Sequence, residues 1–219
     1  MSAGLLFPFM KGVSALSEHY YTNKPSSSHD EKTWTFTLRG EPFSFTTDRG
    51  VFSKGEVDFG SRLLIETFVF PGLDGDILDV GCGYGPIGLA LAKADPSRRV
   101  VMIDVNERAC QLAEKNAKAN GVKNADIHFD ERGLAGFERS ARYAAVVTNP
   151  PIRAGKDVVH DIYEQAYERL IPEGECWVVI QKKQGAPSTK QKLAELFGAE
   201  NVEVKGKKKG YYVFLAKKN

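Results

Sequence analysis

A glycine-rich loop is the first segment of the chain that could bind a ligand. It ends a short apolar run at residues 76–80 and contains Asp79, Gly81, Cys82, Gly83 and Gly85. Glycines let the backbone turn sharply and approach a ligand closely, and a helix that begins directly after them offers free N–H groups. Residues 83–88 match the GxGxxG pattern of dinucleotide-binding proteins, although so short a pattern has low specificity by itself.

Two acids narrow the choice of ligand. Asp79 lies at the end of the first parallel strand, where a carboxylate could bind the ammonium of a methionine moiety but would repel a pyrophosphate. Asp104 ends the next strand, twenty-one residues after Gly83, and could bind both ribose hydroxyls, with Val105 beside it in the cofactor site. Because an aspartate at this second position serves NAD equally well, only Asp79 discriminates. We therefore expect S-adenosyl-L-methionine as the cofactor, with a nicotinamide dinucleotide as the alternative.

The adenine of such a cofactor would lie at the end of the third strand, residues 125–129. Asp130 and Glu131 follow that strand, and a carboxylate there could accept a hydrogen bond from the adenine amino group. The sequence does not choose between these two acids, and two solvated loop acids without a ligand are the alternative.

An asparagine followed by two prolines is the second segment that could take part in chemistry. Asn149, Pro150, Pro151 and Ile152 follow an apolar strand at residues 143–148, at the sheet edge where ligands bind in open α/β folds. Prolines fix φ and lack N–H groups, so the side-chain carbonyl of Asn149 and the backbone carbonyl of Pro150 form a rigid pair of acceptors. An aromatic amine is a poor nucleophile because its lone pair is delocalised into the ring. Two acceptors that grip its hydrogens would turn the lone pair toward an activated methyl group without a strong general base, and Asn149 would then adjoin both cofactor and target.

The elements that must position these residues alternate between strands and helices from residue 76 onward. Strands are expected at residues 76–80, 100–103, 125–129, 143–148 and 176–180, and helices at 85–94, 107–120, 156–170 and 187–197. This alternation predicts a doubly wound, Rossmann-like parallel sheet of the class I methyltransferase type. A turn at residues 206–210 is too short for a parallel crossover, so the last strand, residues 211–216, must run antiparallel to its neighbour.

The part of the chain before residue 76 carries a different pattern. Apolar and polar residues alternate at 34–38 and 43–45 around a turn at 39–42, which predicts a β-hairpin with one buried face. Ser61 is the expected N-cap of a helix over residues 62–70. We therefore expect a flexible extension at 1–16, a hairpin segment at 17–60 packed on the catalytic domain, and a methyltransferase domain at 61–219.

Composition excludes several classes of protein. With 219 residues, of which 42% are hydrophobic, the chain suits one α/β domain. Its three cysteines are scattered, without a CxxC pair or a His/Cys cluster, which argues against a metal site or a disulfide scaffold and fits a reducing cytoplasm. No apolar run approaches the roughly 18 to 20 residues that a membrane-spanning helix needs, so we expect no membrane association.

Taken together, these segments resemble the ribosomal RNA small-subunit methyltransferase C family, whose members methylate the N2 amine of guanine. The resemblance runs from about Ser17 to the C-terminus and is carried by DVGCGYGPIG, the acid at Asp104 and NPPIRAG. It is also carried by residues 19–21, 57–61 and 181–185. It implies that three further residues enclose the methionine end of the cofactor, namely Asp58, Gly60 and Ser61.

Two departures from the family pattern bear on the substrate. Larger members carry a second, degenerate methyltransferase domain that precedes the catalytic one, so self-association as a homodimer or the basic loops must hold RNA here. Related amino-methyltransferases often place Phe or Tyr after Asn-Pro-Pro, where the ring can stack on the target base. Ile152 stands at that position, and the loss of a stack forfeits roughly 1–3 kcal/mol of base binding.

Basic residues follow three elements that end at the same edge of the expected sheet. The net charge is only +2, so their local distribution matters more than the total. The first two clusters follow the fourth and fifth strands, and the third also lies at this edge if the penultimate strand is parallel to them. Together they would form a phosphate-binding surface for ribosomal RNA or the small subunit. The clusters consist of Arg153 with Lys156, Lys182 with Lys183, and Lys207 with Lys208 and Lys209.

The resemblance and the motifs together favour a guanine-N2 methyltransferase acting on 16S ribosomal RNA. Asn-Pro-Pro also serves enzymes that methylate a tRNA base, DNA adenine or protein glutamine, and these remain alternatives. A non-catalytic RNA-binding assembly factor is the alternative outside enzymes. His128 and His160 are expected to be structural, because the mechanism needs no strong base.

Overall fold

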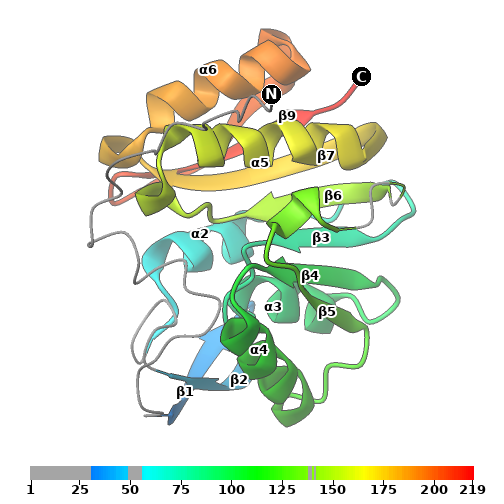
Figure 1. Cartoon of the computed structure of the whole chain (residues 1–219), viewed down its shortest axis with the longest axis vertical. Helices are drawn as coiled ribbons and strands as arrows, with labels where there is room; N and C mark the ends of the chain where they lie inside the picture. Colours follow the sequence, from blue (N-terminus) through cyan, green and yellow to red (C-terminus); the bar gives the residue numbers. More distant parts are fainter. Residues whose placement is uncertain (1–30, 49–55, 138–139, 141) are drawn as a thin grey trace, which may run out of the picture.

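The computed structural model describes residues 31–48, 56–137, 140 and 142–219. Within this part of the chain, seven strands form one mixed sheet in the order β5-β4-β3-β6-β7-β9-β8, with helices on both faces (Figure 1). The strands of this sheet are β3 (Ile77–Val80), β4 (Val100–Asp104), β5 (Ala125–Phe129), β6 (Tyr143–Thr148), β7 (Leu170–Gln181), β8 (Val202–Lys208) and β9 (Tyr211–Lys217). The helices are α2 (Phe59–Thr67), α3 (Pro86–Ala94), α4 (Glu107–Ala119), α5 (Lys156–Arg169) and α6 (Ala186–Phe197), with 3-10 turns η1 (Gly133–Ala135), η2 (Ile152–Ala154), η3 (Lys182–Gln184) and η4 (Ala199–Asn201).

The direction of the strands confirms the expected class I methyltransferase fold. Strands β3 to β7 pair in parallel, whereas β9 is antiparallel to both β7 and β8. Two reversals restore the original direction, so β8 is parallel to β7 and its carboxyl end lies at the edge where β3 and β6 also end. The turn between β8 and β9 is shorter than expected, because β8 continues to Lys208 and leaves only Lys209 and Gly210 between the strands.

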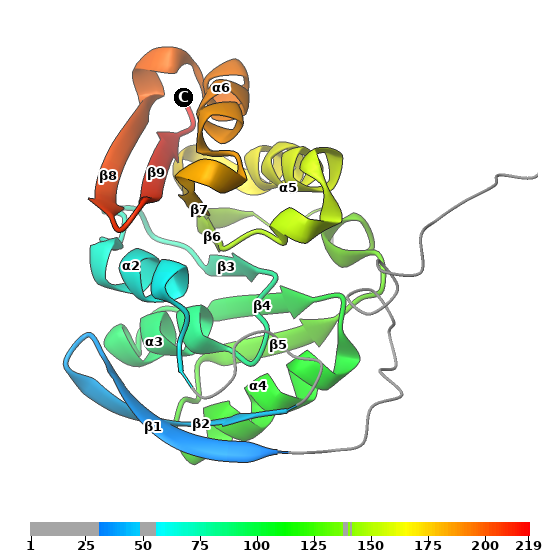
Figure 2. The same ribbon diagram turned by 90° about the vertical axis from the view of Figure 1, so that its left-hand side faces the viewer.

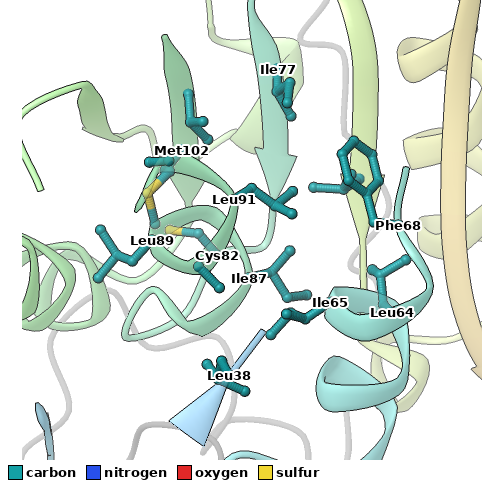
Figure 3. Close-up of a cluster of buried hydrophobic side chains, with 14 of the residues drawn as sticks. Leu38, Leu64, Ile65, Phe68, Ile77, Cys82, Ile87, Leu89, Leu91 and Met102 are labelled. Carbon is teal, nitrogen blue, oxygen red and sulfur yellow. The ribbon is translucent and has the colours of Figure 1, made fainter. Parts of the chain in front are cut away.

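Alternating residues of the strands divide the core into two clusters. Ile77, Met102 and Trp177 face α2, α3 and α4, and Figure 3 shows how leucines and isoleucines of these helices meet the sheet. Leu78 and Val146 face α5 and α6 on the opposite side. Strands buried on both faces, with almost continuous apolar sequence, are what a parallel sheet covered by crossover helices requires.

Helix α2 begins earlier than the sequence suggests. Its N-cap is Asp58, whose Oδ1 accepts a hydrogen bond from the backbone N–H of Ser61 at 3.0 Å, so the expectation that Ser61 caps the helix is wrong. The helix ends at Thr67, and Phe68 already has an extended backbone. Ser61 is 3% exposed, and its side chain contacts Asn149 at the end of β6. The domain boundary expected between residues 60 and 61 lies inside this helix.

The N-terminal hairpin forms as expected, from β1 (Lys32–Leu38) and β2 (Glu41–Thr47) joined by Arg39 and Gly40. It lies across α4 and beside α3, away from the main sheet (Figure 2). Its apolar face adds Leu38 and other side chains to the first cluster, as Figure 3 shows. The expected extension at residues 1–16 and the segment at 19–21 lie outside the described residues, and none of the described helices is long and apolar enough to cross a membrane.

A buried asparagine on α4 ties the hairpin to the domain. The side-chain carbonyl of Asn116 accepts from the backbone N–H of Thr46 at 2.7 Å. Its Nδ2 donates to the backbone carbonyls of Thr46 at 3.0 Å and of Tyr84 at 2.9 Å. One side chain thus binds the edge of β2 that faces away from β1, and it also binds the loop that follows β3.

Asn116→Ala should lower the free energy of unfolding by about 2–4 kcal/mol, because it removes three hydrogen bonds between a buried side chain and the backbone. Urea denaturation would measure this loss. Lys118→Ala is the matched control, since Lys118 is exposed on the same helix. A loss no larger than that of the control would show that water replaces the missing contacts.

Candidate active site

The glycine-rich loop connects the end of β3 to the start of α3. Gly81, Gly83 and Gly85 all have positive φ angles, of 73°, 58° and 100°. The backbone N–H groups of Gly81 and Cys82 donate to the carbonyl of Ile103 at the end of β4, which fixes the loop against the neighbouring strand. A Cβ atom at Gly83 would have no heavy atom within 4 Å, so a ligand can approach this backbone closely. The Cys82 side chain is buried in the core, and this residue therefore contributes its backbone to the loop.

Asp79 is fully buried beneath this loop. Its Oδ2 accepts a hydrogen bond from the backbone N–H of Gly88 at 2.8 Å, whereas its Oδ1 has no hydrogen-bond partner among the described residues. Burial, together with the nearby charge of Asp104, raises the pKa of Asp79 to about 7. A buried carboxylate oxygen without a donor is costly, and a cationic ligand would relieve that cost.

Asp104 lies at the end of β4, beside the same loop. Its Oδ2 accepts from the backbone N–H of Gly83 at 2.8 Å and its Oδ1 from that of Asn106 at 2.9 Å. Burial raises the pKa of this carboxyl group as well. Two acids close together, one of them fully buried, favour a ligand with positive charge over a pyrophosphate, which agrees with the discrimination expected from Asp79. Val105 follows Asp104 and lies next to Gly133 of η1.

The two acids expected near adenine play different parts in their loop. Asp130 accepts a hydrogen bond from the backbone N–H of Arg132 at 2.9 Å, and its carboxylate lies against Gly136. Its own N–H donates to the carbonyl of Asp104, which brings this loop beside the end of β4. Glu131 is exposed next to it. The adenine contact remains a prediction for this pair of acids.

Asn149 follows β6, the strand that pairs with β3, so it lies at the same edge as Asp79. The hydroxyl of Thr148 donates to the carbonyl of Val80 and joins the two strand ends. The Nδ2 of Asn149 donates to Ser61 Oγ at 3.0 Å and to Asp58 Oδ1 at 3.2 Å. Both contacts are made by the amide nitrogen, which leaves the side-chain carbonyl as an acceptor, as the sequence requires.

The residues after Asn149 form the short turn η2. The N–H groups of Ala154 and Gly155 donate to the carbonyls of Pro151 and Ile152, so the bonds that close this turn bypass the carbonyl of Pro150. Ile152 packs against the second core cluster and borders a cavity of about 230 Å³ between α5 and α6. Its side chain is therefore partly engaged in packing.

The three residues that the family resemblance implies, Asp58, Gly60 and Ser61, lie beside segments that are far away in sequence. Asp58 and Ser61 contact Asn149, which is 91 and 88 residues away in sequence. At Gly60, an added Cβ would lie 3.1 Å from the ring of Tyr211, so the start of α2 packs directly on β9. Sequence reasoning missed Tyr211, because nothing local to it signals this contact.

The basic clusters lie at the carboxyl edge of the sheet, although some of their residues belong to a strand and not to a loop. The N–H of Lys182 donates to the carbonyl of Gly210 at 2.7 Å, which places the cluster after β7 beside the turn that follows β8. The ammonium of Lys209 lies 5.1 Å from the centre of the ring of Phe59, the residue that follows Asp58. Lys207 and Lys208 belong to β8 itself, so their expected place in a loop is wrong.

The remaining basic residues lie on η2, the first turn of α5 and η3. Arg153 belongs to η2 and Lys156 begins α5, four and seven residues after Asn149. Lys182 and Lys183 form part of η3. The clusters are thus at the carboxyl edge of the sheet, as expected, and their role in binding RNA stays a prediction.

His128 and His160 both contact residues outside the glycine-rich loop and the segment around Asn149. His160 exchanges a hydrogen bond with Ser188 at 3.0 Å between α5 and α6, and burial lowers its pKa. His128 lies 3.0 Å from the carboxylate of Asp126 on β5. Neither contact involves Asn149, which is consistent with a reaction that needs no strong base.

The site therefore combines a glycine-rich loop over the buried carboxylate of Asp79, which suits a cationic cofactor, with the Asn149 amide on the adjacent strand end. Both lie at the carboxyl edge of a class I methyltransferase sheet. The sequence profile of the methyltransferase small domain matches residues 42–215, most of the chain. The chain belongs to the methyltransferase small domain family. Most of the residues matched lie in the sheet and helices described above, including every element from β3 to β8.

Relatives within this methyltransferase family differ in length. YbxB of Bacillus subtilis (strain 168), an uncharacterized protein, is 55% identical over 203 residues, which are 93% of this chain and 100% of YbxB. Ribosomal RNA small subunit methyltransferase C of Vibrio parahaemolyticus is 31% identical, over 90% of this chain but 57% of the relative. The chain thus matches between 29% and 57% of the length of the ribosomal RNA methyltransferases among its relatives.

A solved structure supports the same comparison. The 16S rRNA N2 methyltransferase RsmC of T. thermophilus, in complex with AdoMet and guanosine, superposes with a TM-score of 0.75 at 28% identity. The match covers 90% of this small-domain methyltransferase and 52% of the RsmC chain. The AdoMet bound by that neighbour agrees with the cofactor expected from Asp79 and Asp104.

Proposed function

We propose that this protein transfers a methyl group from S-adenosylmethionine to the N2 amine of a guanine in small-subunit ribosomal RNA. One observation carries the proposal. A buried carboxylate oxygen of Asp79 without a donor lies at the end of β3, and the acceptor amide of Asn149 lies at the end of the adjacent strand β6. The Asp79 carboxylate would bind a cation and the Asn149 carbonyl would bind an amine, and the two groups lie on adjacent strands at the same edge of the sheet.

The cofactor supplies an activated methyl group on a sulfonium, and the chain supplies its placement. Asp79 would bind the ammonium of the methionine moiety, and Asp104 would bind the ribose through lone pairs not used by Gly83 and Asn106. Asp130 or Glu131 would contact the adenine. The open backbone at Gly83 leaves space for the cofactor to lie against the loop.

The target amine would then lie against Asn149. Its two hydrogens would bind the side-chain carbonyl of Asn149 and the backbone carbonyl of Pro150, which turns the nitrogen lone pair toward the methyl group. The acceptors are fixed before the substrate arrives, so little reorganisation is needed during the reaction. The proton leaves the product amine after transfer, when the nitrogen is positively charged and strongly acidic, and no side chain needs to act as a strong base.

The nature of the substrate rests on two kinds of support. Relatives named as ribosomal RNA small subunit methyltransferases match this chain over about half of their length. The lysines at the carboxyl edge would bind phosphates around the target. A ribosomal RNA substrate implies action in the cytoplasm. A tRNA base, DNA adenine or protein glutamine is the alternative set of acceptors, because an acceptor amide suits these amines and amides too.

Transfer of a tritiated methyl group tests the proposal. Purified protein is incubated with labelled S-adenosylmethionine and with naked 16S RNA, small subunits, tRNA or whole-cell protein, and the product nucleosides are then separated. Labelled N2-methylguanosine from small-subunit RNA is the expected result. Label confined to protein, or to another nucleoside, would replace the substrate assignment while keeping the methyl transfer.

A triple change of Lys207, Lys208 and Lys209 to Ala should weaken RNA binding by roughly tenfold or more at moderate salt. Each lost phosphate contact lowers the slope of log affinity against log salt by about 0.7 for single strands, so the slope should fall by about 2. Affinity for S-adenosylhomocysteine should stay unchanged. Fluorescence anisotropy with a labelled RNA, repeated at several salt concentrations, measures both quantities.

The control removes the same charge from another face. Lys115, Lys118 and Lys123 lie on or just after α4, toward the amino ends of the strands. Changing all three to Ala should leave the RNA affinity within about twofold of the parent protein. Equal losses in the two triple variants would mean that overall charge, and not this edge, attracts the RNA.

A further inference from the structure

We propose that Asp58 and Ser61 are positioning residues that fix the orientation of the Asn149 amide, so that its carbonyl always faces the target amine. This inference rests on the proposed function and assigns these two residues to the acceptor side of the reaction. The family resemblance instead implies that they enclose the methionine end of the cofactor. The two assignments predict different behaviour of variants.

The chemistry of the contacts allows a single orientation of the amide. An ionised carboxylate accepts hydrogen bonds and has none to donate, so Asp58 Oδ1, 3.2 Å from Asn149, must face the NH₂ group. A flipped amide would place two acceptor oxygens against each other at that distance. Ser61 Oγ accepts the second N–H at 3.0 Å, so both hydrogens of the amide are bound.

Orientation matters because the two ends of an asparagine amide have almost the same shape and opposite polarity. With the carbonyl forward, Asn149 accepts a hydrogen from the target amine. With the NH₂ group forward, it would present donors to a group that is itself a donor, and the reactive geometry would be lost. A side chain without partners would visit both states, so a fixed orientation keeps the site in its productive form.

Asp58 and Ser61 are held in turn by the start of α2. Asp58 is the N-cap, and the same Oδ1 that binds Asn149 also accepts from the backbone N–H of Ser61 at 3.0 Å. Gly60 lies between them and packs on the Tyr211 ring with no space for a side chain. The rings of Phe59 and Tyr211 are also in contact, with centroids 5.5 Å apart. The rigid start of a helix, braced by β9, thus fixes the amide that follows β6.

Three substitutions separate positioning from cofactor binding. Asp58→Asn removes the negative charge but remains a good N-cap. The capping N–H of Ser61 keeps the oxygen of the new amide, and not its NH₂ group, toward Asn149. Asp58→Ala removes both acceptor and charge. Ser61→Ala removes the hydroxyl and leaves the backbone N–H that Asp58 caps, so the helix start is unchanged.

We expect kcat to fall about tenfold in Ser61→Ala and about thirtyfold or more in Asp58→Ala, and to stay within about threefold in Asp58→Asn. Affinity for S-adenosylhomocysteine, measured by calorimetry, should stay within about threefold in all three variants. Equal losses of kcat in Asp58→Asn and Asp58→Ala would overturn the inference, because the charge would then be what matters. Losses of cofactor affinity that parallel the losses of kcat would also overturn it.

A measurement without RNA keeps the inference separate from the proposed function. The side-chain NH₂ signals of Asn149 can be assigned in a ¹⁵N spectrum by their absence in Asn149→Ala. Their exchange with water should be at least tenfold slower in the parent protein than in the Asp58→Ala, Ser61→Ala double variant, with unrelated buried amides of the core unchanged as the folding control. Equal exchange rates would overturn the inference, whereas protected signals in a protein that methylates no RNA would reject the proposed substrate alone.

Discussion

Asn149→Ala should lower kcat for methyl transfer by about 10²- to 10³-fold, the loss typical when one preorganised polar group at a reacting centre is removed. The substitution deletes the acceptor that would grip the target amine, and it leaves the carbonyl of Pro150 as the sole acceptor of the pair. Asp58 and Ser61 also lose their partner. Single-turnover transfer at saturating cofactor measures the effect on the chemical step directly.

Cofactor binding separates this expectation from a general disruption of the site. The Asp79 carboxylate and the glycine-rich loop do not depend on the Asn149 side chain for their hydrogen bonds. Affinity for S-adenosylhomocysteine should therefore fall less than about tenfold in Asn149→Ala. A variant that transfers methyl groups at near-parental rates would remove Asn149 from the mechanism, and one that no longer binds the cofactor would assign it to the cofactor site instead.

Much of this site could be read from the sequence because its signals are local. Asp79, Asp104 and Asn149 each follow a run of apolar residues long enough for one strand, and parallel strands bring their carboxyl ends to one edge. Asn106 has the residue type of an N-cap and directly precedes the helix expected at residues 107–120, and its side chain does accept from the N–H groups of Arg108 and Ala109. The fold and the place of these three side chains at one edge of the sheet therefore followed from patterns of a few residues each.

What the sequence did not disclose depends on contacts between distant segments. Ser61 has the residue type of an N-cap, but its hydroxyl bonds Asn149 and the cap falls to Asp58, three residues earlier. Gly206 looks like a turn residue, yet it lies within β8, where an added Cβ would meet the Thr67 side chain at 2.9 Å. In both cases tertiary packing decides between local preferences that are equally good.

Asp79→Asn should abolish most of the affinity for S-adenosylhomocysteine, by about 10²-fold at pH 8, and yet stabilise the protein without cofactor. Loss of a buried charge partner costs several kcal/mol, which accounts for the fall in affinity. The carboxyl of Asp79 has a pKa of about 7 in the folded protein, against 3.8 for an aspartate side chain in water, so the folded state holds its proton more tightly. Unfolding free energy therefore declines as pH rises from about 4 to about 7, where the folded protein is forced to ionise a buried acid.

An asparagine resembles the protonated acid and avoids this penalty. The shift corresponds to roughly 4 kcal/mol, since one pKa unit is worth about 1.4 kcal/mol. The net gain of Asp79→Asn at pH 8 should be smaller, about 2 kcal/mol, because the new amide nitrogen would lack an acceptor. Toward pH 4, where the Asp79 carboxyl is protonated, the gain should turn into a loss of about 2 kcal/mol, because only the cost of the amide nitrogen remains. Thermal unfolding across this range tests it, with Asp76→Asn as the control, since Asp76 is a partly exposed acid at the start of the same strand.

Cofactor affinity should show the opposite dependence on pH in the parent protein. Binding a cation favours the ionised form of Asp79, so affinity should fall by up to about tenfold per pH unit below pH 7, and this slope should be absent in Asp79→Asn. A parent protein whose affinity is flat between pH 5 and 8 would contradict the role of Asp79 as the partner of the ammonium. The buried carboxylate that lowers the stability of the fold is then the same group that makes the site select a cation, and binding of the cofactor offsets the cost of ionising it at the end of β3.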